Sequence, residues 1–394
     1  MRFIHTSDWH LGQTLHGYDR LPEQRLFLEW LRAQLKTYAC DALLVAGDIF
    51  DTISPSAAAQ RLLYEFLANV NRDLPDLQVV LTAGNHDSGV RLEAPIAILE
   101  ALNVHVFGVL PRQDDRLIDY SALSLQLRGA DGSRVTCLPI PFLRAADCPT
   151  PQEGEAPETA FFQQLATIYT PDRQPIVCMG HLYAHGAQVS RSDASERVVG
   201  GLEGVADMAF PPHYCYVALG HIHRRQKVYG RDTIRYSGAP LPMSFAEKGY
   251  QHGVQLVTIT DGQANVESLD YHSPVQLLQL EGTPEAVRSQ IEALPRCEPD
   301  DQAPIVALRL ELQAPMPTLK ADITQWAEGR YLRLGPMEVI YRGAQNETLR
   351  VETAHPRAIE PIDIAQQEWQ RRYGAPMPSD LQALFYDAIR EAAL

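Results

Sequence analysis

The chain has 394 residues, of which 45% are hydrophobic and 21% are charged, and this composition is typical of a folded globular protein. Its length exceeds what one ordinary hydrophobic core supports, so we expect two or three domains. The formal net charge of −15 argues against nonspecific binding of nucleic acid over the whole surface. Any contact with DNA must therefore rely on bound cations and on local basic patches.

Targeting and redox signals point to the cytoplasm. Residues 1–8 already contain a histidine and charged residues, which is not the pattern of a signal peptide. No apolar run approaches the roughly 20 residues that cross a membrane. The six cysteines form no CxxC pair. Cys178 and Cys215 fall in predicted strands, where a free thiol behaves as a small apolar group. We therefore expect a protein of the reducing cytoplasm rather than a secreted one.

The first hundred residues alternate between strands and helices. A helix is predicted over 22–36, and a second helix is predicted to begin with Ser54 as its N-cap and Pro55 at its first position. A third helix is predicted around 92–102. Three apolar runs predict buried strands, at 3–6, 42–46 and 79–83. This alternation predicts an α/β layered core with parallel strand pairing.

The middle of the chain is richer in short strands. Hairpins are predicted around Asp131-Gly132 and Asp261-Gly262, and a helix is predicted near 159–169. Two further buried strands are predicted over 175–179 and 214–219. These elements add antiparallel pairs to the parallel core.

The last third of the chain changes rhythm. From about residue 273, three strands alternate with two helices, which predicts a small α+β domain. Two helices are predicted over 361–394. The domain boundaries expected from these patterns are 1–272, 273–345 and 346–394.

Five predicted strands end in Asp, Asn or His, and four of them have Gly at the turn. Because a layered sheet places the ends of neighbouring strands along one edge, these side chains can converge at one point. The five strand ends are Asp8-x-His10, Gly47-Asp48, Gly84-Asn85-His86-Asp87, Gly180-His181 and Gly220-His221-x-His223.

Carboxylate, imidazole and amide donors without thiolate suit Mn²⁺, Fe²⁺, Zn²⁺ or Mg²⁺. Seven such donors with water can hold two ions about 3.5–4 Å apart that share one carboxylate, and such a pair activates hydroxide and stabilises the oxygens of a phosphoester displacement. A lone histidine at a strand end usually has a structural role, and Asp after Gly is ordinary turn chemistry. Five such ends in this order favour a metal centre.

The order of these motifs resembles the calcineurin-like metallophosphoesterase superfamily and, within it, the SbcD-type nucleases, which are bacterial relatives of the Mre-type nucleases. The resemblance covers about residues 1–245, and it includes Asp87 where the protein phosphatases of the superfamily usually carry Glu. It implies a layered metallophosphoesterase sandwich, with two mixed β-sheets flanked by helices. It also implies that 273–345 is a capping domain that guides DNA and that 346–394 binds an ATPase partner.

The resemblance also implies roles for the donors. His86 would not be a ligand but would face the scissile phosphate as a general acid. Asp51 stands where archaeal relatives carry histidine, so we expect it to cap or to support a metal ligand. One Mn²⁺ ion would be held by Asp8, His10 and His223, the other by Asn85, His181 and His221, with Asp48 bridging them; Mg²⁺ or other divalent ions are the alternatives.

The activity implied is that of a Mn²⁺-dependent DNA nuclease, a 3′→5′ exonuclease on double-stranded ends and an endonuclease on hairpins and single strands. It would act with an SbcC-type coiled-coil ATPase in DNA replication, repair and recombination. The protein would be cytoplasmic and associated with the nucleoid, and it would form a homodimer within a heterotetramer. The helix face of Leu62, Phe66 and Val70 is the nearest candidate for the dimer contact. Candidate basic contacts to DNA are Arg61, Arg91, Arg144, Arg224, Arg225 and Lys227.

Two other functions use the same residues differently. A phosphomonoesterase or a cyclic-nucleotide phosphodiesterase would need the same two-metal site, but the roughly 120-residue extension past the last motif and Asp87 speak against it. A non-catalytic scaffold for an ATPase predicts a broken ligand set, whereas all seven donors are present in this sequence.

Overall fold

The computed structural model describes residues 1–113, 117–151, 156–170, 174–189 and 204–342, together with residues 366, 369, 377, 378, 381 and 382. The chain divides into two compact units, one of residues 1–312 and 316–340 and one of residues 313–315 and 341–394. The helices predicted over 361–394 lie almost wholly outside the described residues. The division of the chain into three domains stays a prediction.

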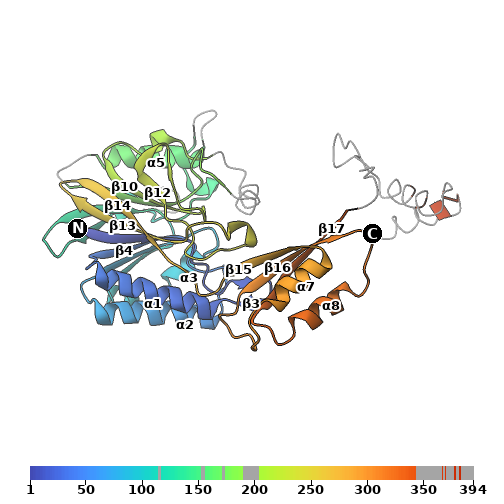
Figure 1. Cartoon of the computed structure of the whole chain (residues 1–394). Coiled ribbons are helices and arrows are strands. Elements are labelled where there is room, and N and C mark those ends of the chain that lie inside the picture. The colour runs from blue at the N-terminus through green and yellow to red at the C-terminus, as the bar shows by residue number, and fades with distance from the viewer. Residues whose placement is uncertain are drawn as a thin grey trace. The chain divides into compact units, whose positions relative to one another are not determined.

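The first six-stranded sheet contains the parallel strands predicted from the N-terminal region (Figure 1). Four of its strands run parallel, and β13 pairs antiparallel with β1. The order across the sheet is β14 (Gln263–Asp270), β13 (Gly253–Thr260), β1 (Arg2–Thr6), β4 (Ala42–Ala46), β5 (Gln78–Thr82) and β6 (Val104–Phe107).

The second six-stranded sheet packs face to face with the first, and apolar side chains of both sheets form one buried cluster that includes Phe3, Leu44 and Tyr216. Strands β8, β9, β10 and β12 run parallel, while the two edge strands pair antiparallel with their neighbours. The order is β11 (Gln226–Val228), β12 (Arg231–Tyr236), β10 (Tyr214–Gly220), β9 (Ile176–His181), β8 (Arg134–Pro139) and β7 (Leu125–Arg128). The expected sandwich of two mixed sheets is confirmed.

Helices cover the outer faces of this sandwich. On the first sheet lie α1 (Leu21–Thr37), α2 (Ala57–Asp73), α3 (Gly89–Glu93) and α4 (Ile96–Glu100). The second sheet is covered by α5 (Pro157–Ile168), with the short 3₁₀ helices η1 (Tyr120–Ala122), η2 (Ala145–Asp147) and η3 (Asp207–Ala209) nearby.

Two predicted helix boundaries are wrong. The N-cap of α2 is Ser56 rather than Ser54, because the Ser56 hydroxyl accepts a hydrogen bond from the backbone N–H of Ala59 at 3.2 Å. The single helix predicted around 92–102 is two short helices that are interrupted at Pro95, which has no backbone N–H to donate and restricts the residue before it.

The proposed dimer face on α2 is also wrong. Leu62, Phe66 and Val70 are 3%, 5% and 1% exposed, and they pack into the core that the first sheet and its helices form. A helix has one apolar stripe, and in α2 that stripe is used within the chain. These three side chains are therefore not available to a second copy.

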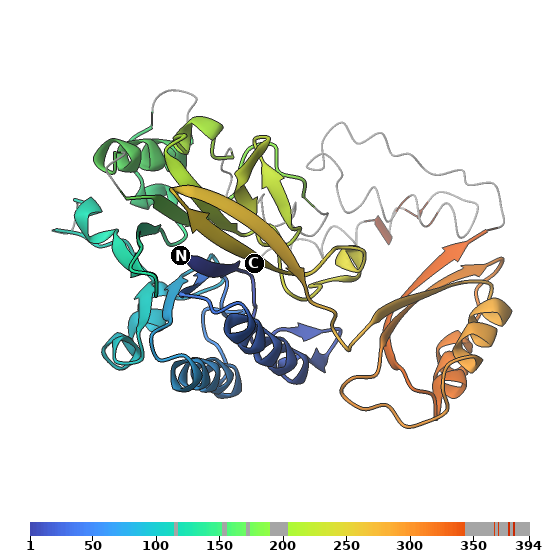
Figure 2. The same cartoon turned by 60° about the vertical axis from the view of Figure 1, so that its left-hand side comes forward.

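The predicted small α+β fold forms around a three-stranded sheet (Figure 2). Its strands are β15 (Leu277–Gly282), β16 (Ile305–Leu312) and β17 (Arg333–Tyr341), and its helices are α7 (Pro284–Glu292) and α8 (Leu319–Ala327). These elements bury their own apolar cluster, which includes Val287, Leu310 and Ile323.

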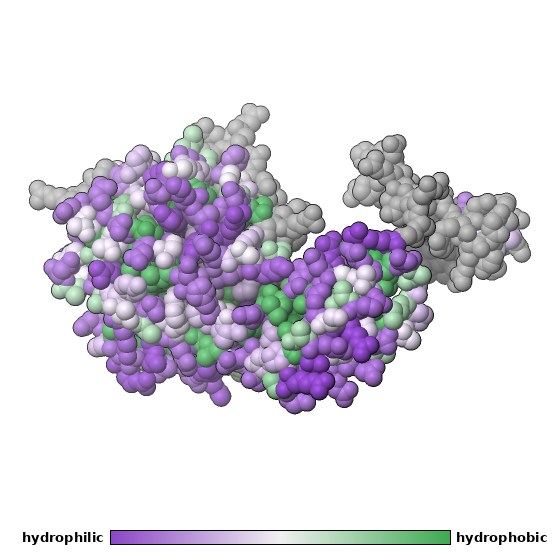
Figure 3. All heavy atoms as spheres, in the orientation of Figure 1, coloured by the Kyte–Doolittle hydropathy of each residue, from purple (hydrophilic) through white to green (hydrophobic). Residues whose placement is uncertain are grey.

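Two short segments of the sandwich contact this small sheet. The hairpin β2 (Thr14–Leu15) and β3 (Tyr18–Asp19) contributes Leu15 to a cluster with Val275 and Ile305. The 3₁₀ helix η4 (Phe245–Glu247) packs Phe245 against the same cluster, and the next residue, Lys248, donates a hydrogen bond to Gln279 at 2.9 Å. Hydrophilic side chains predominate on the face shown in Figure 3. Within the described residues, no helix has the length and apolar character to span a bilayer.

Candidate metal centre

The donor-bearing strand ends meet at one edge of the sandwich. Strands β1, β4 and β5 are parallel neighbours in one sheet, and β9 and β10 are parallel neighbours in the other. The turns that follow are tied together, because the backbone N–H of Asp8 donates to Gly47 and that of His10 to Asp48, both at 3.0 Å. The edge predicted from the sequence is therefore a single buried site with contributions from both sheets.

Four donor residues have a left-handed backbone conformation. The φ angles are 54° at Asp8, 45° at His10, 49° at Asp48 and 100° at His221. Residues with a Cβ rarely adopt positive φ, and such conformations cluster at functional sites where the surrounding structure enforces them. All four residues lie in the turns that follow β1, β4 and β10.

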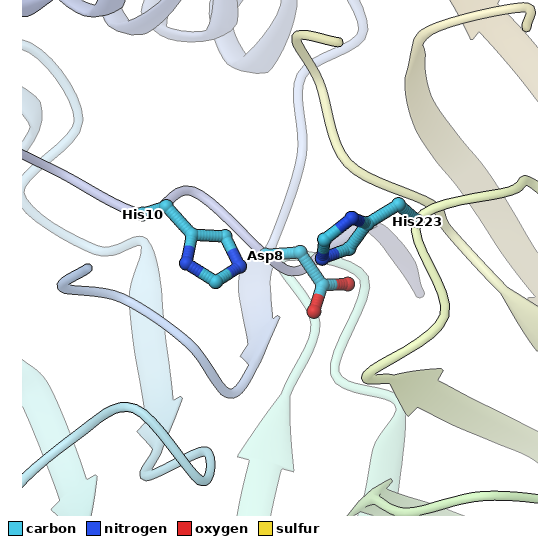
Figure 4. Close-up of side chains that lie close together, drawn as sticks. All are labelled: Asp8, His10 and His223. Atoms are coloured by element: carbon cyan, nitrogen blue, oxygen red, sulfur yellow. The ribbon is translucent and has the colours of Figure 1, made fainter. Parts of the chain in front are cut away.

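Asp8, His10 and His223 form the first group, and their side chains point toward one another (Figure 4). One potential ligand atom from each lies within 4.8 Å of the others. The carboxylate of Asp8 is fixed on both oxygens, since Oδ1 accepts from the backbone N–H of His221 at 3.0 Å and Oδ2 from the Ser7 hydroxyl at 2.5 Å. His10 is 2% exposed, yet neither of its ring nitrogens makes a hydrogen bond.

Asp48, His181 and His221 form the second group, and Asn85 lies between the two histidines. The Asn85 side-chain oxygen is 3.0 Å from Nε2 of His181 and 3.0 Å from Nδ1 of His221. Ring centroids of His181 and His221 are 5.2 Å apart. All four residues predicted for the second ion and the bridge are therefore brought together.

The His181 ring shows why this group suits a cation. Its Nδ1–H donates to the carbonyl of Ala46 at 2.9 Å, so in the neutral ring Nε2 carries the lone pair. Nε2 nevertheless faces two oxygens, Asp48 Oδ2 at 3.2 Å and Asn85 Oδ1 at 3.0 Å. Three groups of acceptor character pointing at one another need a positive charge between them, either a proton or a metal ion.

Without a metal ion, the electrostatics favour the proton. Burial lowers the pKa of His181, but the charge of Asp48 and the hydrogen bond to it outweigh burial and raise this pKa to about 9. Burial raises the pKa of Asp48, and the nearby histidines His181, His10 and His86 outweigh it, so that this pKa falls well below its ordinary value. Asp48 is therefore ionised under all ordinary conditions, as a bridging ligand must be.

Asp48 also links the two groups. Its Oδ2 lies 3.6 Å from Nε2 of His10 and 3.2 Å from Nε2 of His181, so one carboxylate contacts a histidine of each group. Its Oδ1 accepts from the backbone N–H of His86 at 2.9 Å. The geometry is that expected of a carboxylate shared between two cations.

His86 is less buried than His10 and Asp48, and one of its ring nitrogens lies within 4.8 Å of ligand atoms of both. It is half-buried, its ring centroid is 4.8 Å from that of His10, and its Nδ1–H donates to the backbone carbonyl of Asp51 at 2.8 Å. The Asp51 carboxylate lies 3.5 Å from Nδ1 of His10. Asp51 thus contacts one predicted ligand and the predicted general acid, in line with the supporting role expected for it.

Asp87 fastens the turns that carry these residues. Its carboxylate accepts from the backbone N–H groups of Ile49, Phe50 and Gly84 at 3.0, 2.9 and 2.8 Å. Burial and the charge of Asp48 raise the pKa of Asp87 to about 6, although the three backbone hydrogen bonds lower it. Asp87, which distinguishes this chain from the protein phosphatases, therefore joins the β4 and β5 strand ends.

Two glycines leave room for the ligands. A Cβ at Gly84 would lie 2.1 Å from Oδ1 of Asp48, and a Cβ at Gly47 would lie 2.2 Å from Nδ1 of His181. Gly47 also has a φ of 85°, which disfavours other residues. Gly84 is thus required by the closeness of the β4 and β5 strand ends within the first sheet, and Gly47 by the closeness of the first sheet to His181 of the second.

The predicted basic contacts lie in varied surroundings. Arg224 stacks over the ring of Tyr250 at 5.6 Å, Arg225 pairs with Asp270 at 2.5 Å, and Lys227 pairs with Asp232 at 3.0 Å. Arg225 is the most engaged, since its side chain is only 10% exposed. The remaining three are exposed, namely Arg61, Arg91 and Arg144.

One residue that contacts the site was missed at the sequence level. Glu247 is fully buried, and its Oε1 lies 3.2 Å from Nδ1 of His223. Burial raises the pKa of Glu247, but the hydrogen bond and charge of His223 outweigh burial and lower it. The only signal was Ser244-x-x-Glu247, a spacing typical of a helix capping box, which by itself indicates local structure rather than a metal centre.

The donor set fits a pair of divalent cations. Imidazole, carboxylate and amide donors without thiolate are the ligands of first-row divalent ions and Mg²⁺. One unbonded ring nitrogen of buried His10 would be satisfied by a bound cation, and so would His181 Nε2 with the two oxygens that face it. The site therefore implies divalent metal ions.

Known proteins are similar in sequence to this chain over most of its length. The model of the calcineurin-like phosphoesterase family matches residues 1–225. The D subunit of nuclease SbcCD from Rhodobacter capsulatus is 38% identical over 383 residues, covering 93% of this chain and 92% of that protein. The proteins of the same name from Escherichia coli K12 and Bacillus subtilis are each 34% identical, covering 93% and 67% of this chain and 95% and 67% of their own lengths. The chain belongs to the calcineurin-like phosphoesterase family and, within it, to the family of the SbcCD nuclease's D subunits.

Proposed function

We propose that the chain is a Mn²⁺-dependent DNA nuclease that works with an SbcC-type coiled-coil ATPase. The observation that carries the proposal is the pair of donor groups joined through the Asp48 carboxylate. Similarity to the D subunits of nuclease SbcCD over 93% of the chain supports a nucleic acid, which we propose to be DNA, among phosphoester substrates. The proposed activities are 3′→5′ exonuclease action on duplex ends and endonuclease action on hairpins and single strands.

The proposed ligands follow the two groups. Asp8, His10 and His223 would hold one ion, Asn85, His181 and His221 the other, and Asp48 both. When bound, such a pair supplies Lewis acidity, which lowers the pKa of water and neutralises charge on a phosphodiester. The burial of Asp8, His10, Asp48 and His181 keeps bulk water away and strengthens this electrostatic effect.

His86 is proposed as the general acid. Donation of Nδ1–H to the Asp51 carbonyl fixes the ring orientation and leaves Nε2 as the nitrogen that exchanges a proton with the substrate. Protonated at Nε2, the ring would stabilise the phosphate charge and give its proton to the leaving oxygen. The partial exposure of its side chain suits contact with the substrate.

The other parts of the chain are assigned by family. We propose that residues 1–272 form the nuclease domain, 273–345 the capping domain that guides DNA, and 346–394 the segment that binds the ATPase. All of the six basic candidates except Arg225 are exposed, and Arg91 and Arg224 closely follow site residues in the chain. Phosphate contacts from these positions would hold the backbone of the DNA. Assembly as a homodimer within a heterotetramer belongs to the same proposal.

The function is tested by comparing substrates. Hairpin DNA, end-labelled duplex, p-nitrophenyl phosphate and bis-p-nitrophenyl phosphate are incubated with purified chain and Mn²⁺, alone and with an SbcC-type ATPase. We expect cleavage of DNA and little turnover of the monoester. Strong monoesterase activity with inert DNA would overturn the nuclease proposal in favour of a phosphomonoesterase.

A further inference from the structure

A buried acid outside the proposed ligand set contacts one of the metal-site histidines. Glu247 belongs to the one-turn helix η4, and none of its surface is exposed. Its Oε1 is 3.2 Å from Nδ1 of His223. Burial of an ionisable side chain costs free energy unless hydrogen bonds or an opposite charge compensate for it, so the partners of Glu247 indicate its role.

Local hydrogen bonds fix the Glu247 carboxylate in place. Oε2 accepts from the backbone N–H of Met243 at 2.8 Å, and the Ser244 hydroxyl lies 3.5 Å from Oε1. The backbone carbonyl of Glu247 lies 3.2 Å from Nε2 of His252, whose Nδ1 contacts the Ala239 carbonyl at 2.9 Å. These hydrogen bonds restrain the carboxylate, which gives the His223 imidazole an acceptor in a defined position.

The contact determines which nitrogen of His223 carries hydrogen. A carboxylate only accepts, so Nδ1 must donate, and Nε2 is then the nitrogen with a lone pair. His223 contributes a ring nitrogen to the group with Asp8 and His10, and its ring centroid is 5.2 Å from that of His10 (Figure 4). A carboxylate behind a ligand histidine fixes the tautomer and raises the basicity of the ligating nitrogen.

Two other histidines of the centre are supported differently. His181 donates to a neutral backbone carbonyl at 2.9 Å. The Asp51 carboxylate is 3.5 Å from His10 and makes no hydrogen bond with it. The contact between Glu247 and His223 thus brings a fixed negative charge to the group that already holds the Asp8 carboxylate.

We propose that Glu247 is a positioning residue of the metal centre, which holds His223 with Nδ1 protonated and so presents Nε2 to the cation shared with Asp8 and His10. The proposal rests on the two-metal function proposed above. It assigns Glu247 no contact with substrate. It predicts that loss of the carboxylate weakens the binding of one cation and leaves the other unchanged.

The test is calorimetric titration of the metal-free full chain with Mn²⁺. Glu247→Gln keeps the shape of the side chain but has one acceptor oxygen where Glu247 uses two. We expect one of two binding events to weaken roughly 10–100-fold and the other to stay within about twofold. Glu158→Gln is the matched control, because Glu158 is also a buried carboxylate but has no contact with the metal-site histidines, and it should leave both events unchanged.

A double-mutant cycle separates positioning from a general structural effect. If Glu247 acts through His223, then adding Glu247→Gln to His223→Ala should change Mn²⁺ affinity no further. Additive losses, or wild-type affinities in Glu247→Gln, would overturn the proposal. If Glu247→Gln fails to fold, Glu247→Asp is titrated instead, since it keeps the charge but shortens the reach, and it should weaken the same event.

The outcome also distinguishes this proposal from the proposed function. A wild-type chain that binds no pair of ions would overturn the two-metal function itself. A wild-type chain that binds two ions, with a Glu247→Gln variant that binds them equally well, would overturn only the role of Glu247. Nitrogen-15 spectra of the histidine rings give an independent reading, since the metal-free wild type should show His223 as the Nδ1–H tautomer and the variant should not.

Discussion

Asp48 and His86 are neighbours in the centre, but their side chains differ in burial and in the groups that they contact. The carboxylate of Asp48 is almost fully buried and contacts histidines of both donor groups, at 3.6 and 3.2 Å. His86 is half-buried and donates to the Asp51 backbone. Under the proposed roles Asp48 binds metal and His86 reacts with the substrate, so their substitutions should have separable effects.

Asp48→Asn and His86→Gln should therefore differ in metal content. Asn carries no charge to share, so Asp48→Asn should lose both ions and all activity. His86→Gln should keep two ions and lose roughly 10²–10⁴-fold in turnover, the usual contribution of a general acid. Elemental analysis of dialysed protein and hairpin cleavage give the two readings. His272→Gln, at an exposed histidine, is the control; equal metal loss in both site variants would contradict the assigned roles.

His5 gives a prediction for pH. It is fully buried beside Tyr216, whose hydroxyl lies 2.9 Å from its Nδ1, and burial lowers its pKa from 6.5 to about 3. The unfolded chain therefore takes up a proton before the folded chain does. The stability that neutral His5 allows is fully present above pH 6.5 and is lost as pH falls toward 3.

Between pH 7.5 and pH 5.5 the unfolding free energy of the wild type should fall by about 1.4 kcal/mol more than that of His5→Phe. Urea unfolding in the presence of EDTA at both pH values measures the difference. Phe keeps the aromatic contact with Tyr216 but does not titrate. The same pH dependence in both proteins would show that His5 is protonated in the folded state.

At the scale of elements, the start of α2 shows how one hydroxyl decides where a helix begins. Ser56→Ala should cost about 1 kcal/mol of unfolding free energy, because the N–H of Ala59 loses the Ser56 oxygen that it now reaches at 3.2 Å. Ser54→Ala, two residues earlier and exposed, is the matched control and should change stability by less than about 0.5 kcal/mol. A larger loss at Ser54 would restore the boundary expected from the sequence.

The elements that carry the site were predictable because each combines an apolar strand with an abrupt polar end. That local pattern indicated β1, β4, β5, β9 and β10, and the topology of layered sheets implied their convergence. Burial of a helix face is different, since the apolar stripe of α2 reads the same whether it packs within the chain or on a second copy. Glu247 was missed for a related reason, because a contact between η4 and the end of β10 spans 24 residues and leaves no periodic signal.

At the scale of the whole molecule, the metal centre joins two sheets. Asp8, His10, Asp48 and Asn85 follow strands of the first sheet, and His181, His221 and His223 lie at the strand ends of the second. Cations bound between them would cross-link the sandwich at its edge. Because the unfolded chain does not preserve this arrangement, binding free energy becomes folding free energy.

Mn²⁺ should accordingly stabilise the fold. At a free concentration of 100 times the dissociation constant, each site would add about 2.7 kcal/mol to the unfolding free energy. Thermal unfolding in EDTA and in graded Mn²⁺ measures the gain, with Asp48→Asn as the control that should show none. A melting temperature that does not depend on Mn²⁺ would contradict cross-linking of the two sheets.

Removal of residues 361–394 should separate chemistry from assembly. The described residues of the sandwich bury large apolar clusters of their own, so the shortened chain should keep Mn²⁺-dependent cleavage within about twofold of the full chain. Its association with the ATPase should weaken. Co-purification of tagged ATPase with both chains measures this, and unchanged recovery would place the docking segment elsewhere.

The one-turn helix η4 has a neighbour on each side. Glu247 reaches His223, while Phe245 and Lys248 are fastened to the three-stranded sheet through the cluster of Val275 and Ile305 and through Gln279. Since a single turn cannot stretch, a displacement of that sheet large enough to drag Phe245 would also tilt the imidazole behind the cation. The affinity of the chain for Mn²⁺ would then depend on the position of the three-stranded sheet. A ligand or partner that moved this sheet would change the chemistry of the metal centre.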